Sequence, residues 1–389
     1  MIMMRAAVVV AAVLAIGSLA GAATPPPAPA PWDLAPVLQP ILDRHKLPGM
    51  VGAVVEGDRA VAIGAVGVRR AGSPDRVTPD DRFHIGSCTK AMTATLIAML
   101  VEEKKLAWST TLAQAFPDLA ARMTPAYRAV TLEQLLTHRG GLPQNLDAGG
   151  LWGRLWNHTG TPVEQRLALV EGVLTAEPEA PPGTKYIYSN AGYAVAGAMA
   201  EKAASRPWED LMRERLFAPL GMTSAGFGAP GTKDVLDQPR GHDAAGRPVE
   251  PGPGADNPAA IGPGGTVHCT IGDWAKFVAL HLAGEGPAAR LLPAETFRKL
   301  HTPVPDPATA YAMGWLACDR PWGGGRVLTH AGTNTRWYAV AWLAPKRNFA
   351  VLVACNQGGD PAAKACDEAA AAMIQEYLGR KKVGEGAKK

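Results

Sequence analysis

Apolar runs of strand length lie near both ends of the chain, whereas helical patterns and loops fill its middle. Residues 50–55 and 60–68 are two apolar runs separated by Gly57-Asp58, which is typical of a hairpin between antiparallel strands. Residues 338–343 and 349–354 form a second pair of the same kind. The sequence therefore predicts a sheet that is assembled from both ends of the chain.

Helical patterns flank and separate these strands. A helix with proline in its first turn is predicted over residues 36–45, and an alanine-rich helix over residues 361–378. Residues 91–101 and 191–204 are further helices in the middle of the chain. This order of elements indicates an α+β fold, with one lobe made of an antiparallel sheet flanked by helices and an all-α lobe inserted into it. The expected sheet lobe spans about residues 32–86 and 300–378, and the expected helical lobe about residues 87–299.

Residues 241–265 have no hydrophobic period and are rich in glycine, proline and alanine, so they are predicted to form one long loop. Loops of this length in compact enzymes are usually functional or disordered. The loop ends before Thr270 and Asp273, which have the spacing of a capping box at the start of another helix.

The N-terminus has the pattern of a secretory signal peptide. Arg5 precedes an apolar stretch over residues 6–16, and small residues follow at 19–23. The prediction is a signal peptide over residues 1–22, a Pro/Ala-rich tether over residues 23–31, and a protein exported to the periplasm or secreted. No later apolar run is long enough to span a membrane, so no integral span is expected after cleavage; an uncleaved N-terminal anchor is the alternative.

The formal net charge of +4 comes from the ends of the chain. The last ten residues carry +4 and Arg5 adds +1, which leaves −1 for the body. A body with this charge gives little reason to expect nucleic acid as a partner, and residues 379–389 are predicted to be a solvated basic tail.

Five cysteines occur, and their spacing does not suggest a zinc site. An exported protein can form disulfides, but an odd number of cysteines leaves at least one thiol free or available to another chain. Cys88 is the candidate for the free thiol among the cysteines at positions 88, 269, 318, 355 and 366.

Ser87 and Lys90 form a Ser-x-x-Lys motif at the start of the helix predicted over residues 91–101. Side chains three positions apart share a helix face, so a neutral Lys90 amine could take the proton of the Ser87 hydroxyl. The free N–H groups and dipole of a first turn also favour developing negative charge. Cys88 lies about 100° around such a helix and is set aside as the nucleophile. The alternative is a capping serine with a solvated lysine.

Tyr188-Ser189-Asn190 stands directly before the helix predicted over residues 191–204. A phenol held near a lysine is pushed towards phenolate, so Tyr188 is a candidate general base or proton relay. Asn190 has both a donor and an acceptor, which suits it to orient Lys90 and a substrate amide. Ordinary capping of the following helix remains the alternative.

His330-Ala331-Gly332 follows an apolar pair and is predicted to end or line a strand. Small residues after His330 allow a substrate backbone to lie against that strand. The N–H of Thr333, together with that of Ser87, could form an oxyanion hole. The alternative is a histidine that only makes hydrogen bonds at the end of a strand.

In this order and context the three motifs resemble those of the serine β-lactamase and penicillin-binding-protein superfamily, specifically its class C-like branch. No Gly-x-Ser-x-Gly elbow supports the alternative of an α/β-hydrolase. The resemblance extends to further stretches along nearly the whole chain after the tether: Leu135-Leu136-Thr137-His138, Gly141-Leu142-Pro143, Pro182-Gly183-Thr184, Pro219-Leu220-Gly221-Met222 and Gly264-Gly265.

The resemblance implies the roles of the candidate residues. Ser87 would be the acylated nucleophile, with Lys90 and Tyr188 as the proton-transfer pair. Asn190 would position the substrate, and the amides of Ser87 and Thr333 would bind the oxyanion. It also implies a sheet lobe and a helical lobe with the site between them, and no metal or organic cofactor.

One position departs from the class C β-lactamases proper, which carry lysine where this chain has His330. A histidine is mostly neutral near pH 7 and holds a carboxylate less firmly than a permanent cation. The prediction is therefore an esterase or a D-amino-acid peptidase or amidase acting on a small ester, amide or peptide. Alternatives are a true β-lactamase, for which Arg336 could bind the carboxylate, and a non-hydrolysing penicillin-binding sensor.

The sequence does not decide the oligomeric state. It also leaves open whether three tryptophans line an acyl pocket or pack in the core: Trp152, Trp156 and Trp337.

Overall fold

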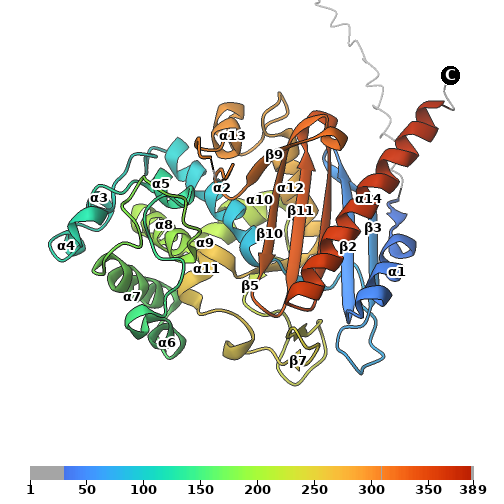
Figure 1. Ribbon diagram of the computed structural model, residues 1–389, viewed down its shortest axis with the longest axis horizontal. Coiled ribbons are helices and arrows are strands. Elements are labelled where there is room, and N and C mark those ends of the chain that lie inside the picture. The colour runs from blue at the N-terminus through green and yellow to red at the C-terminus, as the bar shows by residue number, and fades with distance from the viewer. Residues whose placement is uncertain (1–29, 308, 387–389) are drawn as a thin grey trace, which may run out of the picture. The chain divides into compact units, whose positions relative to one another are not determined.

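A seven-stranded sheet joins the two ends of the chain in the computed structural model, which describes residues 30–386 except residue 308 (Figure 1). The predicted signal peptide and nearly all of the tether lie outside the described residues. Both predicted hairpins are confirmed, and the central pairing of β2 with β12 is antiparallel. In spatial order the strands are β1 (Trp32–Asp33), β3 (Arg59–Gly67), β2 (Gly49–Glu56), β12 (Phe349–Cys355), β11 (Tyr338–Ala344), β10 (Gly325–Thr333) and β9 (Leu316–Arg320).

The central strands β2 and β12 are apolar except for Glu56 at the end of β2, because both faces of the sheet are covered. Successive side chains of a strand point to opposite faces. In β2, Val51 and Ala53 accordingly join one buried cluster, whereas Met50 and Val54 join the other. Every residue of β12 is buried. The sheet is thus the partition between two hydrophobic cores.

Helices α1 (Ala35–His45) and α14 (Asp360–Gly386) pack together on one face of the sheet, and α12 (Ile271–Ala283) packs on the other (Figure 1). Helix α14 continues well past its predicted end at residue 378. The guanidinium of Arg380 lies 4.2 Å from the centre of the Trp32 ring, and Lys381 forms an ion pair with Glu56. The start of the basic tail is therefore helical, and its cations contact Trp32 and Glu56 while their side chains stay exposed, as expected of a solvated end.

The helical part of the chain surrounds α2 (Thr89–Glu102) and α8 (Asn190–Ala204), two largely buried helices that pack against each other. Both were predicted, with ends within two residues of those observed. The remaining helices and helical turns are η1 (Gly86–Cys88), α3 (Leu112–Ala115), α4 (Pro117–Ala120), η2 (Pro125–Tyr127), α5 (Leu132–Leu136), η3 (Ala148–Gly150), α6 (Leu151–Trp156), α7 (Pro162–Leu174), α9 (Trp208–Leu211), η4 (Met212–Phe217), α10 (Ala218–Leu220), α13 (Ala294–His301), η7 (Pro321–Gly323) and η8 (Pro345–Arg347).

A small second sheet crosses the boundary expected between the lobes. Its middle strand, β8 (Val267–Thr270), lies between β4 (Arg82–His84) and β5 (Gly226–Phe227). Strand β4 belongs to the expected sheet lobe, whereas β8 and the following α12 fall within the expected helical lobe. Since α12 covers the main sheet, the lobe division at residue 299 does not describe the packing.

Thr270 caps α12 as expected, because its hydroxyl oxygen accepts a hydrogen bond from the Asp273 N–H. The reciprocal half of the predicted capping box is replaced. One carboxylate oxygen of Asp273 accepts instead from the N–H and the hydroxyl of Ser224. The acidic side chain therefore ties the start of α12 to the segment before β5.

Residues 241–265 contain several short elements rather than the single loop that was predicted. These elements are strands β6 (Gly241–His242) and β7 (Pro248–Val249) and the turns η5 (Pro253–Ala255), η6 (Ala259–Ile261) and α11 (Gly262–Gly265). Single turns need no hydrophobic period, and proline fixes the φ angle that begins them. All four residues of α11 are buried, and this segment leads into β8.

Candidate active site

Ser87 lies in η1, the tight turn between β4 and α2. Gly86 and Cys88 on either side of it are buried, whereas Ser87 is partly exposed. Gly86 has φ +51°, a left-handed conformation that glycine adopts without strain. The serine was predicted in the first turn of the helix. It lies instead in the short turn directly before α2, which begins at Thr89.

The Lys90 side chain is fully buried and has three polar neighbours. Its Nζ lies 3.1 Å from Ser87 Oγ, 2.7 Å from Asn190 Oδ1 and 2.7 Å from the Gly264 carbonyl oxygen. Burial lowers the pKa of Lys90 to about 7. A neutral amine has two protons for the two carbonyl oxygens, so its lone pair is left for the Ser87 hydroxyl proton. With this pKa the Lys90 amine is neutral in about half the molecules at pH 7, beside the hydroxyl whose proton it is predicted to take.

The Tyr188 ring lies beneath this amine, with Lys90 Nζ 4.7 Å from the ring centre. Burial raises the pKa of Tyr188, and the nearby Ser87 side chain offsets only part of this, so the net shift is upward. The prediction that a neighbouring cation pushes Tyr188 towards phenolate is therefore wrong. Burial disfavours the phenolate, and Lys90, whose pKa is itself lowered, faces the ring centre.

Ser189 caps α8, and the neighbouring Asn190 contacts Lys90. Ser189 is the N-cap of α8, because its Oγ accepts from the Gly192 N–H at 3.2 Å. The same hydroxyl donates to the Pro143 carbonyl oxygen at 2.6 Å. Asn190 opens the helix and directs Oδ1 to Lys90. The cap made by Ser189 thus fixes the backbone at Asn190, whose side chain contacts Lys90.

His330 on β10 is buried and neutral. Burial, together with the nearby Lys90, lowers its pKa to about 3. Its Nδ1 lies 2.6 Å from the Ala331 carbonyl oxygen and must carry the ring proton, so Nε2 accepts from the Tyr311 hydroxyl at 3.2 Å. His330 was expected to be mostly neutral near pH 7, as an exposed histidine is. Its lowered pKa makes the neutral form more dominant than that.

The end of β10 packs directly on the turn that carries Ser87. A Cβ atom on Gly332 would lie 2.1 Å from the Ile85 oxygen and 2.6 Å from the Ser87 nitrogen. A Cβ atom on Gly86 would lie 2.3 Å from the Thr333 nitrogen. Glycine is therefore required on both sides of this contact. The structure brings the two backbone amides named from the sequence, those of Ser87 and Thr333, to the same place.

A buried polar network that sequence reasoning missed joins these two backbone segments. His84 Nδ1 accepts from the Gly86 N–H at 3.1 Å, and its Nε2 lies 2.8 Å from Asp256 Oδ2. The Asn334 amide donates to Asp256 Oδ1 at 2.9 Å. Asp256 comes from the segment predicted to be one long loop, of a length that is usually functional or disordered, and this was the only signal. Nothing in the sequence places Asp256 beside His84.

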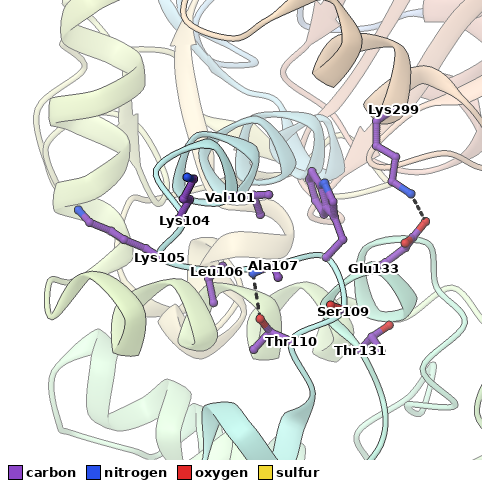
Figure 2. A pocket seen from close by; sticks show the side chains of 11 residues that line it. Val101, Lys104, Lys105, Leu106, Ala107, Ser109, Thr110, Thr131, Glu133 and Lys299 are labelled. Atoms are coloured by element: carbon purple, nitrogen blue, oxygen red, sulfur yellow. Dashed lines mark hydrogen bonds and ion pairs between the residues drawn. The ribbon is translucent and has the colours of Figure 1, made fainter.

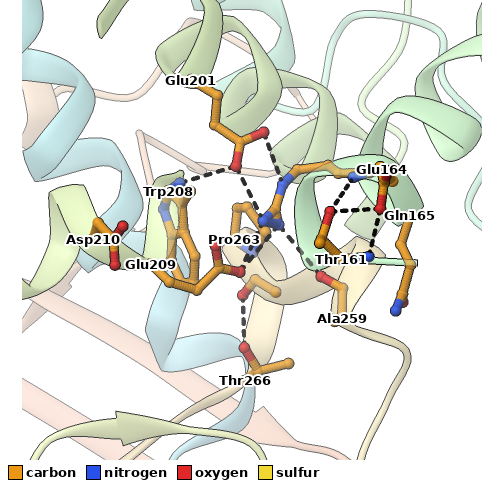
Figure 3. A network of polar contacts seen from close by, with 12 residues as sticks. Thr161, Glu164, Gln165, Glu201, Trp208, Glu209, Asp210, Ala259, Pro263 and Thr266 are labelled. Atoms are coloured by element: carbon orange, nitrogen blue, oxygen red, sulfur yellow. Dashed lines mark hydrogen bonds and ion pairs between the residues drawn. The ribbon is translucent and has the colours of Figure 1, made fainter. Parts of the chain in front are cut away.

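Gly264, the other acceptor for Lys90, was also missed as a site residue. It lies in α11, and the preceding turn η6 is anchored by the buried guanidinium of Arg166, which contacts the Ala259 carbonyl oxygen at 3.3 Å. Figure 3 shows this network, in which Glu201 and Glu209 balance the buried charge, at 3.3 and 2.8 Å from Arg166 Nη2. The ion pairs thus anchor the turn that directly precedes α11, the element that contains Gly264.

The remaining candidates fall in different surroundings. Trp337 is a core residue, 1% exposed and in edge contact with Phe83. Trp152 and Trp156 pair with each other on α6. Arg336 lines a cavity of about 630 Å³ together with Thr333. The Arg336 Nε is buried and has no hydrogen-bond partner within residues 30–386.

The cysteines are free thiols, as predicted for Cys88. Burial raises the pKa of Cys88, which disfavours the thiolate and agrees with its rejection as the nucleophile. Cys355 and Cys366 are also unbonded, although their sulfur atoms lie 3.6 Å apart.

Within the described part of the chain, no group of three or more His, Cys, Asp or Glu side chains could hold a metal ion.

A larger cavity, of about 810 Å³, lies at the far end of α2 (Figure 2). Its wall includes Lys104 and Trp108, and an ion pair between Lys299 and Glu133 borders it. None of the predicted site residues lines it. The cavity is therefore not the candidate active site.

A sheet lobe joined to a helical part, with Ser87 in the turn before α2 and the buried Lys90 on α2, is the arrangement of the β-lactamase and penicillin-binding-protein fold. The chain belongs to the β-lactamase family, whose family model, described as "Beta-lactamase", matches residues 34–374.

Known proteins of several kinds are similar to this chain. Unguisins hydrolase ungD' of Aspergillus campestris is 30% identical over 342 residues, which cover 84% of this chain and 62% of the relative. The chain thus spans less than two thirds of that protein. Penicillin-binding protein 4 of Amycolatopsis lactamdurans is 29% identical over 326 residues, covering 81% and 82%. The octameric penicillin-binding protein homologue from Pyrococcus abyssi shares the fold, with a TM-score of 0.70 at 23% identity over 88% of this chain and 77% of that one.

Proposed function

We propose that this chain is an exported serine hydrolase that forms an acyl-enzyme on Ser87 and acts on small esters or on D-amino-acid peptides or amides. One observation carries the proposal. The buried Lys90 amine has carbonyl acceptors for two protons, from Asn190 and Gly264, and meets the Ser87 hydroxyl on its third side.

Acylation follows from this arrangement. Ser87 Oγ attacks the substrate carbonyl carbon while its proton passes to the neutral Lys90 amine. The carbonyl electron pair moves onto oxygen, where the N–H groups of Ser87 and Thr333 stabilise the negative charge. When the intermediate collapses, the leaving group takes a proton from the Tyr188 hydroxyl, which regains one from the Lys90 ammonium. The products are the acyl-enzyme and the protonated leaving group.

Deacylation reverses the proton path. Water attacks the acyl carbon and gives its proton, through Tyr188, to Lys90. Ser87 Oγ leaves and recovers a proton from the Lys90 ammonium, which restores the resting state. Tyr188 acts as a relay rather than as a phenolate base, in agreement with its raised pKa.

The character of His330 supports an esterase or peptidase over a β-lactamase. A buried neutral imidazole held by Tyr311 offers no cation to a β-lactam carboxylate. Arg336 lies in the wall of the cavity beside Thr333 and could take the carboxylate of a D-amino-acid peptide. The names of the relatives, a hydrolase and a penicillin-binding protein, agree with acyl transfer in general.

Export is proposed from the N-terminal pattern over residues 1–22. The helices of the described residues include none that is long and apolar enough to cross a membrane.

The test is acylation of Ser87. The purified protein is treated with a fluorophosphonate or a fluorescent penicillin, and its intact mass is measured, with Ser87→Ala as the control. We expect one adduct that Ser87→Ala lacks; absence of a serine-dependent adduct with either probe refutes the proposal.

Turnover of a short-chain p-nitrophenyl ester, a D-alanyl amide and a chromogenic cephalosporin then separates the substrate classes. We expect turnover of the ester or the amide to exceed that of the cephalosporin. A penicilloyl adduct that persists without turnover of any of the three indicates a penicillin-binding sensor instead.

A further inference from the structure

His138 has no role in the chemistry above, although it belongs to one of the stretches that mark the family resemblance. It follows α5 and is 2% exposed. Its φ is +58°, the left-handed conformation that non-glycine residues rarely adopt. A strained backbone at a buried polar residue calls for a compensating role.

The contacts of His138 lie on either side of Tyr188. Its carbonyl oxygen accepts from the Ile187 N–H at 2.8 Å, and its Nδ1 accepts from the Ser189 N–H at 3.0 Å. Its ring centre lies 4.4 Å from that of Tyr188. One residue thus holds the backbone before and after the tyrosine and also packs against its ring.

The protonation of His138 fits this role. Because Nδ1 accepts a backbone N–H, the neutral ring carries its proton on Nε2. That nitrogen is buried and has no hydrogen-bond partner within the described residues. An unsatisfied donor costs stability, so packing alone does not account for a histidine here. Burial, with Lys90 and His330 nearby, lowers the pKa of His138, which keeps Nδ1 an acceptor.

We propose that His138 is a positioning residue, which fixes the Tyr188 hydroxyl against Ser87 and Lys90 by accepting hydrogen bonds from both residues that flank the tyrosine. The inference rests on the relay role proposed for Tyr188. It gives a function to His138 in the stretch Leu135-Leu136-Thr137-His138, at the end of α5.

Two variants separate the acceptor from the backbone conformation. Glycine and asparagine both tolerate a positive φ, but only asparagine has an acceptor where Nδ1 lies. We expect His138→Gly to lower the second-order rate constant of fluorophosphonate labelling about 10- to 100-fold, as for a displaced catalytic group. His138→Asn should stay within about threefold of the parent because it keeps the acceptor.

A double-mutant cycle tests whether the effect passes through Tyr188. In a Tyr188→Phe background, His138→Gly should cause less than about a threefold further loss. An equal loss in both backgrounds overturns the proposal, as does a His138→Gly variant that labels like the parent. If His138→Gly does not fold, a loss of more than about tenfold in His138→Asn overturns it.

A structural measurement keeps this inference separate from the proposed function. 3-Fluorotyrosine is incorporated at position 188, and its ¹⁹F NMR spectrum is recorded without any substrate. We expect one sharp resonance in the parent and in His138→Asn, and a shifted or broadened one in His138→Gly. Identical spectra overturn the role of His138 even if Ser87 reacts. A parent protein that is not acylated, with spectra as expected, refutes the proposed function alone.

Discussion

The pH dependence of Ser87 acylation gives the sharpest test of the neutral lysine. A lysine in water, with a pKa of 10.5, is neutral in about one molecule in 3,000 at pH 7. Lowering its pKa to about 7 makes about half the molecules neutral. The labelling rate should therefore rise about tenfold per pH unit below 7 and level off above about pH 8.

The perturbation is Asn190→Asp, which places a carboxylate where Oδ1 now lies, 2.7 Å from Lys90 Nζ. An opposite charge at this distance favours the ammonium and raises a pKa by about 1–3 units. The midpoint should move from about 7 to between about 8 and 10, and labelling at pH 7 should fall between about 5-fold and about 500-fold. The nearly isosteric change leaves the volume at the site the same.

The assay is the second-order rate constant of fluorophosphonate labelling between pH 5 and pH 10, followed by intact mass. Unfolding at each pH is checked by circular dichroism, so that loss of fold is not read as loss of the base. A flat profile between pH 5 and pH 8 in the parent refutes the neutral-lysine mechanism. An unchanged midpoint in Asn190→Asp also refutes it, because the titrating group would then not be Lys90.

Three further predictions concern packing and stability. Gly332→Ala should reduce Ser87 labelling more than about 100-fold, since its Cβ would collide with the Ser87 turn; Gly272→Ala, in open space on α12, should be neutral or stabilise by up to about 1 kcal/mol. Arg166→Ala should lower the free energy of unfolding in urea by about 3–5 kcal/mol, because two carboxylates lose their buried partner. Burial lowers the pKa values of His330 and His268 to about 3 and about 4, below an unfolded value of about 6.5. The unfolded chain therefore binds more protons below pH 6.5, and stability measured in urea should fall by about 1.6 kcal/mol per histidine between pH 6.5 and pH 5.

Each of these has a result that would contradict it. Equal labelling by Gly332→Ala and Gly272→Ala would show that β10 does not pack on the turn. An unfolding free energy of Arg166→Ala within 1 kcal/mol of the parent would show that the ion pairs are not buried as described. A His268→Gln variant that keeps the full pH dependence would exclude that histidine as a source of it.

The local part of the site followed from sequence spacing. Ser87 and Lys90 meet because three positions on a helical turn share one face, and no other element is needed for that contact. Ser189 and Thr270 cap helices because a short polar side chain reaches the N–H three residues ahead. The paired apolar runs predicted both hairpins, since alternate side chains of a strand fill two cores.

Tertiary structure decided everything that depends on burial or on distant partners. Burial set the direction of the Tyr188 pKa, which adjacency to a lysine had predicted wrongly. Three sets of contacts join residues about 50 to 170 positions apart along the chain. They are the hydrogen bond from Lys90 to the Gly264 carbonyl oxygen, the link from His84 through Asp256 to Asn334, and the contacts of His138 with the residues beside Tyr188. The sequence thus pointed to the groups that we propose carry the chemistry, whereas the protonation state and alignment of those groups exist only once the chain has folded, because water is excluded from them only then.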